Sequence, residues 1–210
     1  MPLQQNPIKH RWEGLDRVEA AEYIVQLRDV FKLDFLYTII HDWIVDEGWG
    51  PRDDTKFLET YYTQRDHPQF GKEIWVRWRL WKDSPGAKPG GKVSLFKWMM
   101  DLDFKIIGLK DAEIVYKNQK IKMDKGEFEL TCRSAVVIDY GGAFEKAGFA
   151  QRFTNFLFAR RVHRRRLGAE KKMCIEESYR LREFVLNYFK LENMFPEKEM
   201  GEVYVKRTME

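Results

Sequence analysis

The sequence predicts an α+β domain with two layers, in which helices cover the apolar face of an antiparallel β-meander of about five strands. Two observations lead to this fold. Hydrophobic and polar residues alternate with a period of two over residues 56–140, which is typical of strands with one buried face. The flanking segments repeat hydrophobic residues every three or four positions, which is typical of helices. Amphipathic helices and an amphipathic sheet bury both apolar surfaces by packing together.

Residues 16–47 are predicted to be helical. Leu33, Leu36, Ile40 and Trp43 recur at spacings of three and four and therefore share one helix face. A stop follows at Gly48–Pro51, because glycine accepts left-handed dihedrals and proline cannot continue a helix. A break within residues 29–32, giving two helices, is the alternative.

The predicted sheet occupies residues 56–140. The alternation is clear in 73–82 and unbroken in 96–107, a run longer than an ordinary strand, so a bulge or a long projecting hairpin is expected there. Strands at 112–117 and 120–123 are predicted around a turn at 118–119. A second tight turn at 124–126 is predicted to precede the last strand.

The remainder is predicted to be helical and then irregular. Residues 147–167 and 171–191 are expected to form two C-terminal helices separated near Gly168. Cys174, Leu181, Val185 and Tyr188 mark the buried stripe of the second one. The tail, 192–210, carries residues 203–205 as either a short added strand or a mobile end.

Length and composition fit one domain over residues 1–210. A chain of this length buries about 70% of the surface that it exposes when unfolded. With 44% hydrophobic residues and a net charge of +4, the composition excludes a disordered chain. Two cysteines exclude a disulfide scaffold and a cysteine-based metal site, and no cofactor is predicted.

The sequence shows neither a secretory signal in its first fourteen residues nor an apolar run near the roughly 20 residues that cross a bilayer. A cytoplasmic protein without a transmembrane segment is therefore expected.

The net positive charge is concentrated in one segment. From Gln151 to Arg182, ten Lys and Arg residues face three acidic ones, which gives +7, while the rest of the chain sums to −3. Guanidinium groups bind phosphates through paired hydrogen bonds, so an anionic partner such as nucleic acid, lipid head groups or an acidic protein is predicted. A solvated helix whose arginines pair with Glu170, Glu176 and Glu177 is the alternative. The predicted anion-binding residues are Arg160, Arg161, Arg164, Arg165 and Arg166.

Catalytic signals are few. No phosphate-binding glycine loop or nucleophile elbow is present, and Asp42 and Asp46 are better explained as the polar face of a helix than as a metal site. Asp101, Asp103 and Lys105 alternate along one predicted strand, over a stretch that resembles the motif of PD-(D/E)xK nucleases. The resemblance implies that a pair of carboxylates holds Mg²⁺ while the lysine helps to position the attacking water. Glu73 is expected roughly opposite Asp103 on the same face and completes the candidate set.

A second group of residues predicts an interface. Trp75, Arg77, Arg79, Trp81 and Met99 fall on the sheet face opposite the apolar one. Exposed tryptophan and arginine side chains are typical of contact surfaces. A second layer of this chain folding over that face is the alternative.

The function predicted first is a non-enzymatic interaction or assembly protein. It would form a homo-oligomer through the aromatic sheet face and present the basic helix to an anionic partner. A nucleic-acid-binding module or Mg²⁺-dependent nuclease is the second hypothesis. A small-molecule carrier, in which helices and a curved aromatic sheet enclose a pocket, is the third.

Overall fold

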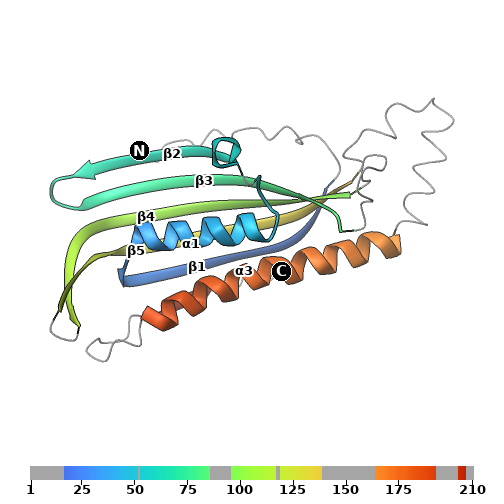
Figure 1. Cartoon of the computed structure of the whole chain (residues 1–210). Coiled ribbons are helices and arrows are strands. Elements are labelled where there is room, and N and C mark those ends of the chain that lie inside the picture. Colours follow the sequence, from blue (N-terminus) through green and yellow to red (C-terminus); the bar gives the residue numbers. More distant parts are fainter. Residues whose placement is uncertain are drawn as a thin grey trace.

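The computed structural model describes residues 17–51, 53–85, 96–116, 119–138, 164–192 and 203–206. Six antiparallel strands form one sheet in the order β2-β3-β4-β5-β1-β6. Two α-helices pack against it (Figure 1). The elements are β1 (Arg17–Phe31), α1 (Leu33–Asp46), the 3-10 turn η1 (Asp54–Lys56), β2 (Glu59–His67), β3 (Gly71–Asp83), β4 (Phe96–Tyr116), β5 (Gln119–Ile138), α3 (Arg164–Glu192) and β6 (Val203–Lys206).

Both helices lie over the same face of the sheet, called the inner face here, and the opposite side is called the outer face (Figure 1). Alternate residues of β1, β3, β4 and β5 are buried on the inner face, as the period of two predicts. The predicted two-layer α+β fold is confirmed. The buried inner-face residues of the three central strands include Ile74, Val76, Trp78, Leu80, Trp98, Met100, Leu102, Phe104, Ile106, Phe128, Leu130, Cys132 and Val136.

The prediction that residues 16–47 are helical is correct for 33–46 and wrong for 17–31, which form β1. Tyr23, Val25 and Leu27 of β1 are buried, whereas Glu22 and Arg28 between and beside them are exposed. β1 pairs with β5 along its whole length, so burial against a neighbouring strand overrides the helical propensity of its alanines and glutamates. β1 is the fifth long strand, and the predicted region 56–140 supplies the other four.

β4 and β5 form the long hairpin that the unbroken alternation predicts, and a bulge bends it as well. The register shifts between Ile107 and Lys110, and Gly108 there has a φ of +66°. Gly126 faces this bend, and a Cβ on it would lie 3.1 Å from the Ile107 carbonyl oxygen. Residues 124–126 thus continue β5, so the predicted tight turn and the separate strand after it are wrong. Glycine at this point lets two backbones approach closely where the hairpin bends.

α3 is one continuous helix through Gly168, so the predicted separation near that residue is wrong; residues 147–163 lie outside the described part of the chain. A Cβ at Gly168 would meet nothing within 4 Å, so the glycine marks no close contact. Its cost of about 1 kcal/mol relative to alanine is small beside the packing of the predicted stripe, whose four members are all buried. In the tail, β6 pairs with Ile24–Leu27 of β1, which confirms the short added strand.

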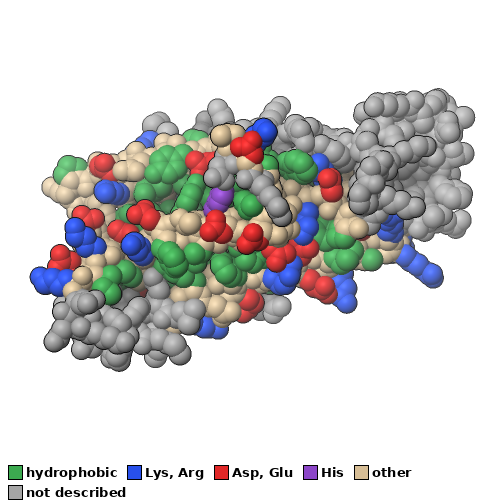
Figure 2. All heavy atoms as spheres, viewed as in Figure 1, with side chains coloured by type: hydrophobic (Ala, Val, Ile, Leu, Met, Phe, Trp, Pro, Cys, Tyr) green, Lys and Arg blue, Asp and Glu red, His purple; other side chains and the backbone are tan. Residues whose placement is uncertain are grey.

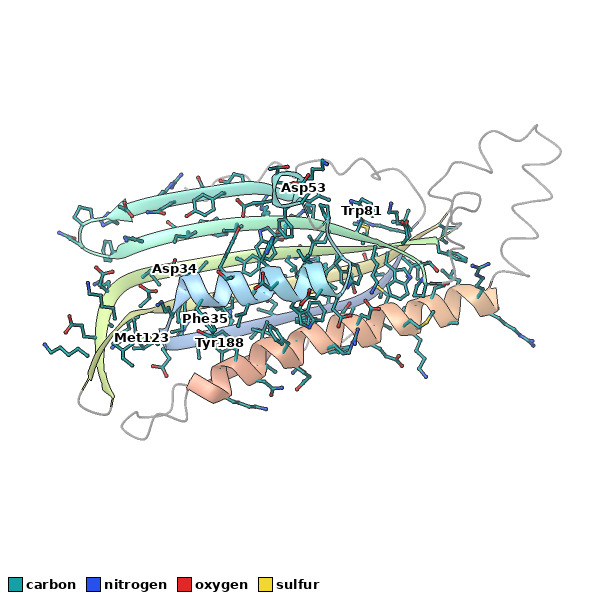
Figure 3. The ribbon with its side chains drawn as sticks, viewed as in Figure 1. Asp34, Phe35, Asp53, Trp81, Met123 and Tyr188 are labelled. Atoms are coloured by element: carbon teal, nitrogen blue, oxygen red, sulfur yellow. The ribbon has the colours of Figure 1, made fainter. Side chains whose placement is uncertain are left out.

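The start of α1 is attached at two points far away in the sequence. The Leu33 backbone N–H donates to Asp124 Oδ2 of β5 at 3.1 Å, and the Tyr188 hydroxyl of α3 donates to the Lys32 carbonyl at 3.4 Å. Phe35 of α1 packs on Tyr188 with ring centroids 5.9 Å apart (Figure 3). A carboxylate at a helix N-terminus is favourable, because it meets unpaired N–H groups and the positive end of the helix dipole. These contacts fix the height of α1 above the sheet.

Candidate functional site

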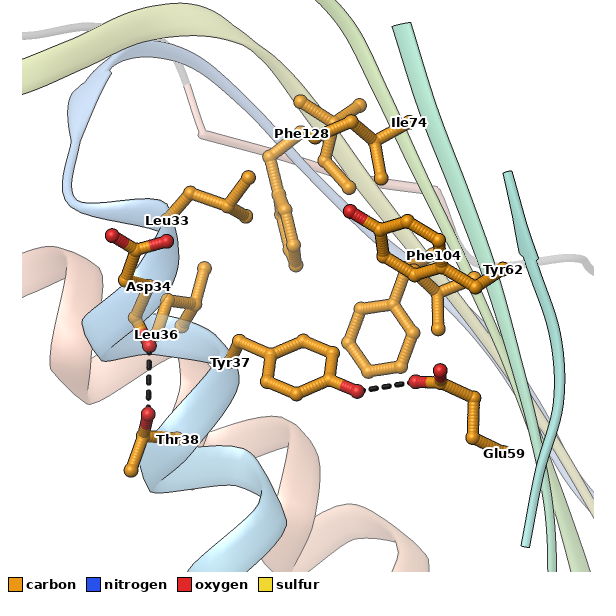
Figure 4. Close-up of a pocket in the computed structure, with 12 residues that line it drawn as sticks. Leu33, Asp34, Leu36, Tyr37, Thr38, Glu59, Tyr62, Ile74, Phe104 and Phe128 are labelled. Atoms are coloured by element: carbon orange, nitrogen blue, oxygen red, sulfur yellow. Dashed lines mark hydrogen bonds between the residues drawn. The ribbon is translucent and has the colours of Figure 1, made fainter. Parts of the chain in front are cut away.

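A cavity of about 390 Å³ lies between the first turns of α1 and the inner face of the sheet (Figure 4). Its floor is apolar and buried, whereas its rim is polar and partly exposed. The floor consists of the sheet residues Ile74, Val76, Phe104, Ile106 and Phe128, and Leu36 of α1 faces it from above. The rim consists of Leu33, Asp34, Tyr37, Thr38, Glu59 and Tyr62.

The floor results from the same alternation that forms the sheet. Ile74 pairs with Ile106 and Val76 with Phe104 across β3 and β4, and Ile106 pairs with Phe128 of β5. Directly opposed residues of neighbouring strands point to the same face, so these five side chains form one continuous apolar surface. α1 is held above this surface and does not fill the space beneath its first turns.

One side of the cavity is closed by a polar bridge between the two layers. The Tyr37 hydroxyl reaches from α1 and donates a short hydrogen bond to Glu59 Oε2 of β2 (Figure 4). The indole N–H of Trp78, in β3, donates to the same oxygen at 3.0 Å. Burial, followed by the hydrogen bond to Glu59, raises the pKa of the Tyr37 phenol well above its ordinary value. Tyr37 therefore stays protonated and donates throughout the physiological range.

The charged residues of the rim are both acidic. Asp34 lies in the first turn of α1 and is exposed, and Glu59 lies at the start of β2. Acidic side chains are interspersed with hydrophobic patches over this side of the molecule (Figure 2). Among the described residues that line the cavity there is no Lys, Arg or His.

The outer face carries a network of charges that pair with one another. Arg79 contacts Asp103 at 2.7 Å and Asp101 at 3.7 Å. Asp103 also forms ion pairs with Arg77 at 3.9 Å and with Arg133 of β5 at 3.7 Å. Burial raises the pKa of Asp101 against the opposing effect of Arg79. These acids and arginines neutralise each other within the sheet.

The predicted interface residues have internal partners too. The indole of Trp75 donates to Glu73 at 2.7 Å, and the Lys105 ammonium lies 5.2 Å from the Trp75 ring centroid. The Lys97 ammonium lies 3.5 Å from the Trp81 ring centroid. Both tryptophans are half-buried.

Met99 is 5% exposed and packs with Ala135 and Val137 in a small cluster on the outer face. The prediction that Met99 is exposed is therefore wrong.

The nuclease grouping does not form. Asp103 pairs with Arg77, and Glu73 lies beside the register shift where Lys72 pairs with Leu109 and Ile74 with Ile106. Glu73 is therefore about 13 Å along the sheet from Asp103, at about 3.3 Å per residue. The placement of Glu73 opposite Asp103 was wrong because β3 and β4 keep one register from Ile74 to Asp83, in which Arg77 lies opposite Asp103. Nowhere in the described ranges do three His, Cys, Asp or Glu residues gather as metal ligands.

The basic segment is only partly described, because Arg160 and Arg161 lie outside the described residues. Arg164 and Arg165 are exposed at the start of α3. Arg166 contacts Glu170 at 4.0 Å, and its guanidinium lies 5.6 Å from the Phe96 ring centroid.

Glu170 is 3% exposed and anchors this end of α3. Its carboxylate accepts hydrogen bonds from the Ser84 hydroxyl at 2.6 Å and from the Trp98 indole at 3.0 Å. The predicted pairing of an arginine with Glu170 is thus observed for Arg166 alone within the described part of the segment.

Comparisons of the chain with protein-family models, with curated proteins and with solved structures found no match. Sequence reasoning did not single out Tyr37, Glu59 or Asp34. Tyr37 follows a residue of the apolar α1 stripe and Glu59 precedes the sheet alternation, so neither has a distinctive pattern in the sequence.

Proposed function

We propose that the protein binds an apolar small molecule in the cavity between α1 and the sheet. The observation that carries this proposal is the apolar lining of six buried side chains around a space of about 390 Å³. Binding pockets for small molecules have volumes of about 300–1,000 Å³ and combine an apolar lining with a few polar groups that orient the ligand. The bridge from Tyr37 to Glu59 supplies such groups here.

A fluorescence titration tests this function. The neutral probe N-phenyl-1-naphthylamine emits more strongly in an apolar environment, so we expect a saturable increase in fluorescence with one site per chain. The variant Val76→Phe places a phenyl ring in the cavity floor and should weaken binding at least about tenfold, equivalent to about 1.4 kcal/mol. Ile106→Phe should have the same effect from the neighbouring strand.

Ile24→Phe is the matched control, because Ile24 pairs with Thr131 and points to the outer face. It should leave the affinity for the probe within about twofold, a difference of about 0.4 kcal/mol. Equal affinities for the wild-type protein, Val76→Phe and Ile106→Phe would refute the proposal, as would the absence of saturable binding.

A second candidate function is assembly with partners, as the sequence predicts. Exposed Arg164 and Arg165 support an anionic partner at the start of α3. The half-buried Trp75 and Trp81 support a homo-oligomer formed through the outer face. The intramolecular ion pairs of that face make the cavity the stronger candidate.

A cytoplasmic location belongs to the same proposal. Neither α1 nor α3 combines the length and the apolar composition that a membrane-spanning helix requires. Cys132 and Cys174 are buried free thiols, which supports a reducing compartment. Burial raises the pKa of each thiol to about 12, so both remain protonated.

A further inference from the structure

We infer that the ligand of this cavity is an amphiphile with a protonated amine head group, bound with its apolar part on the floor and its head at Glu59. This inference rests on the proposed binding function and specifies the class of ligand. It follows from the hydrogen-bonding state of Glu59, from the charges of the rim and from the relative position of floor and rim.

The Glu59 carboxylate accepts both of its observed side-chain hydrogen bonds on one oxygen. Tyr37 and Trp78 both donate to Oε2 of its carboxylate. Their two bonds hold the carboxylate in place and leave Oε1 to a third donor. A protonated amine carries N–H donors and no acceptor, and hydrogen bonds between ionised groups are roughly twice as strong as neutral ones.

The rim favours positive charge over negative charge. Asp34 provides a second carboxylate at the mouth, and the described lining contains no basic side chain. A carboxylate head group would therefore meet two like charges without a counter-ion.

The positions of floor and rim set the orientation. The floor residues Phe104 and Phe128 lie between the strands and α1, whereas Tyr37 extends toward Glu59 at the side of the cavity (Figure 4). A linear alkyl chain on the floor can place its terminal group beside Glu59. Burial of its CH₂ groups is favourable, so the chain supplies affinity and the head group supplies selectivity.

A matched series of ten-carbon ligands tests the inference: decylamine, decanol and decanoate, each below its micelle concentration, measured by displacement of N-phenyl-1-naphthylamine at pH 7. The amine is protonated at this pH, as its reference pKa is near that of lysine, about 10.4. We expect decylamine to bind at least about tenfold more tightly than decanoate, with decanol between them.

Glu59→Gln removes the charge and keeps an oxygen that accepts from Tyr37 and Trp78. It should reduce the preference for amine over carboxylate by at least about fivefold, close to 1 kcal/mol, while decanol affinity changes less than about twofold. Asp34→Asn should reduce the same preference by a smaller factor. A measurement on the wild-type protein covers the case in which a variant does not fold. The amine-to-carboxylate ratio should fall as NaCl rises from 20 to 500 mM, because salt screens exposed charges.

Tighter binding of decanoate than of decylamine would overturn the inference, and so would a preference for the amine that neither variant nor salt reduces. Either result leaves the binding function intact, since a ligand is still bound. If no member of the series displaces the probe, and the probe itself does not bind, the proposed function fails and the inference fails with it.

Discussion

On the outer face of the sheet, Asp101 and Asp103 lie within 4 Å of arginines on neighbouring strands. On the inner face, the two acidic residues of the rim lie beside a cavity whose lining contains no basic residue among those described. Both faces thus combine aromatic and acidic side chains, and the cavity lies on the inner one. The difference shows that residue types alone do not distinguish the two faces of this protein.

The two faces also differ in how their tryptophans contribute to stability. Trp78 on the inner face is fully buried, and its ring lies 4.7–5.0 Å from those of Tyr37, Phe57 and Phe104. Trp78→Ala should lower the free energy of unfolding by about 3–5 kcal/mol, the range for a large aromatic residue replaced by alanine in a core. Urea denaturation followed by far-ultraviolet circular dichroism measures this change.

The matched outer-face variant is Trp75→Ala. Trp75 is half-buried and contacts Lys105, so its loss removes one partly exposed cation–π contact, worth about 0.5–1 kcal/mol, and some apolar burial. Trp75→Ala should lower the free energy of unfolding by less than half as much as Trp78→Ala does. Equal losses would contradict the distinction between the two faces and would make Trp75 part of a core.

The outer-face network predicts unequal roles for its two aspartates. Asp103 contacts three arginines, so Asp103→Asn should destabilise the protein by about 1–3 kcal/mol at pH 7, as expected when buried partners are left unmatched. Asp101→Asn should destabilise the protein less than Asp103→Asn does. Burial raises the pKa of Asp101, so its ionised form is disfavoured in the native state. Chemical denaturation of both variants at pH 7 compares them.

The raised pKa of Asp101 determines the direction in which the stability of the protein changes with pH. Its native pKa lies above that of the unfolded chain, so the native state binds the proton more readily between the two values, and stability falls as pH rises through that window. The stability of the wild type relative to Asp101→Asn should therefore increase as the pH is lowered from 7 toward 4. A relative decrease over this range would show that the Arg79 pair outweighs burial at this carboxyl.

The assignment of residues to the two faces of β3 and β4 could be predicted from the sequence, whereas β1 and the position of Glu73 could not. The alternation in 73–82 and 96–107 is regular, so the side of the sheet on which each residue lies was correct. β1 was missed because its alanines and glutamates favour helix locally, and only pairing with β5 decides its structure. Glu73 was placed wrongly because the register between β3 and β4 is a property of the two strands together, and it sets Arg77 opposite Asp103.

The cavity could not be predicted for a similar reason. Its volume depends on the height of α1, which Asp124 and Tyr188 fix through contacts that span 91 and 156 positions in the sequence. The apolar floor residues look like ordinary core residues until the distance between the two layers is known. A pocket of this kind is a tertiary property without a sequence motif.

The smallest predicted effects concern the basic start of α3. Arg166→Gln should lower stability by up to about 1 kcal/mol, because the Arg166 side chain is half-exposed and its contact with Glu170 is a partly screened ion pair. The double variant Arg164→Gln/Arg165→Gln should leave stability unchanged within about 0.5 kcal/mol. If these two arginines contact nucleic acid, the slope of log affinity against log salt should flatten by about 0.9 for each. An unchanged slope would remove them from any duplex contact.

The position of a bound ligand tests the central claim most directly. Isotope-filtered NMR of methyl-labelled protein with unlabelled N-phenyl-1-naphthylamine detects nuclear Overhauser effects between the ligand and methyl groups nearby. The cavity predicts cross-peaks to Leu36, Ile74, Val76 and Ile106 on the inner face. Cross-peaks confined to the outer-face methyls of Ile24, Met99 and Val137 would contradict the claim and would place the binding surface on the opposite side of the sheet.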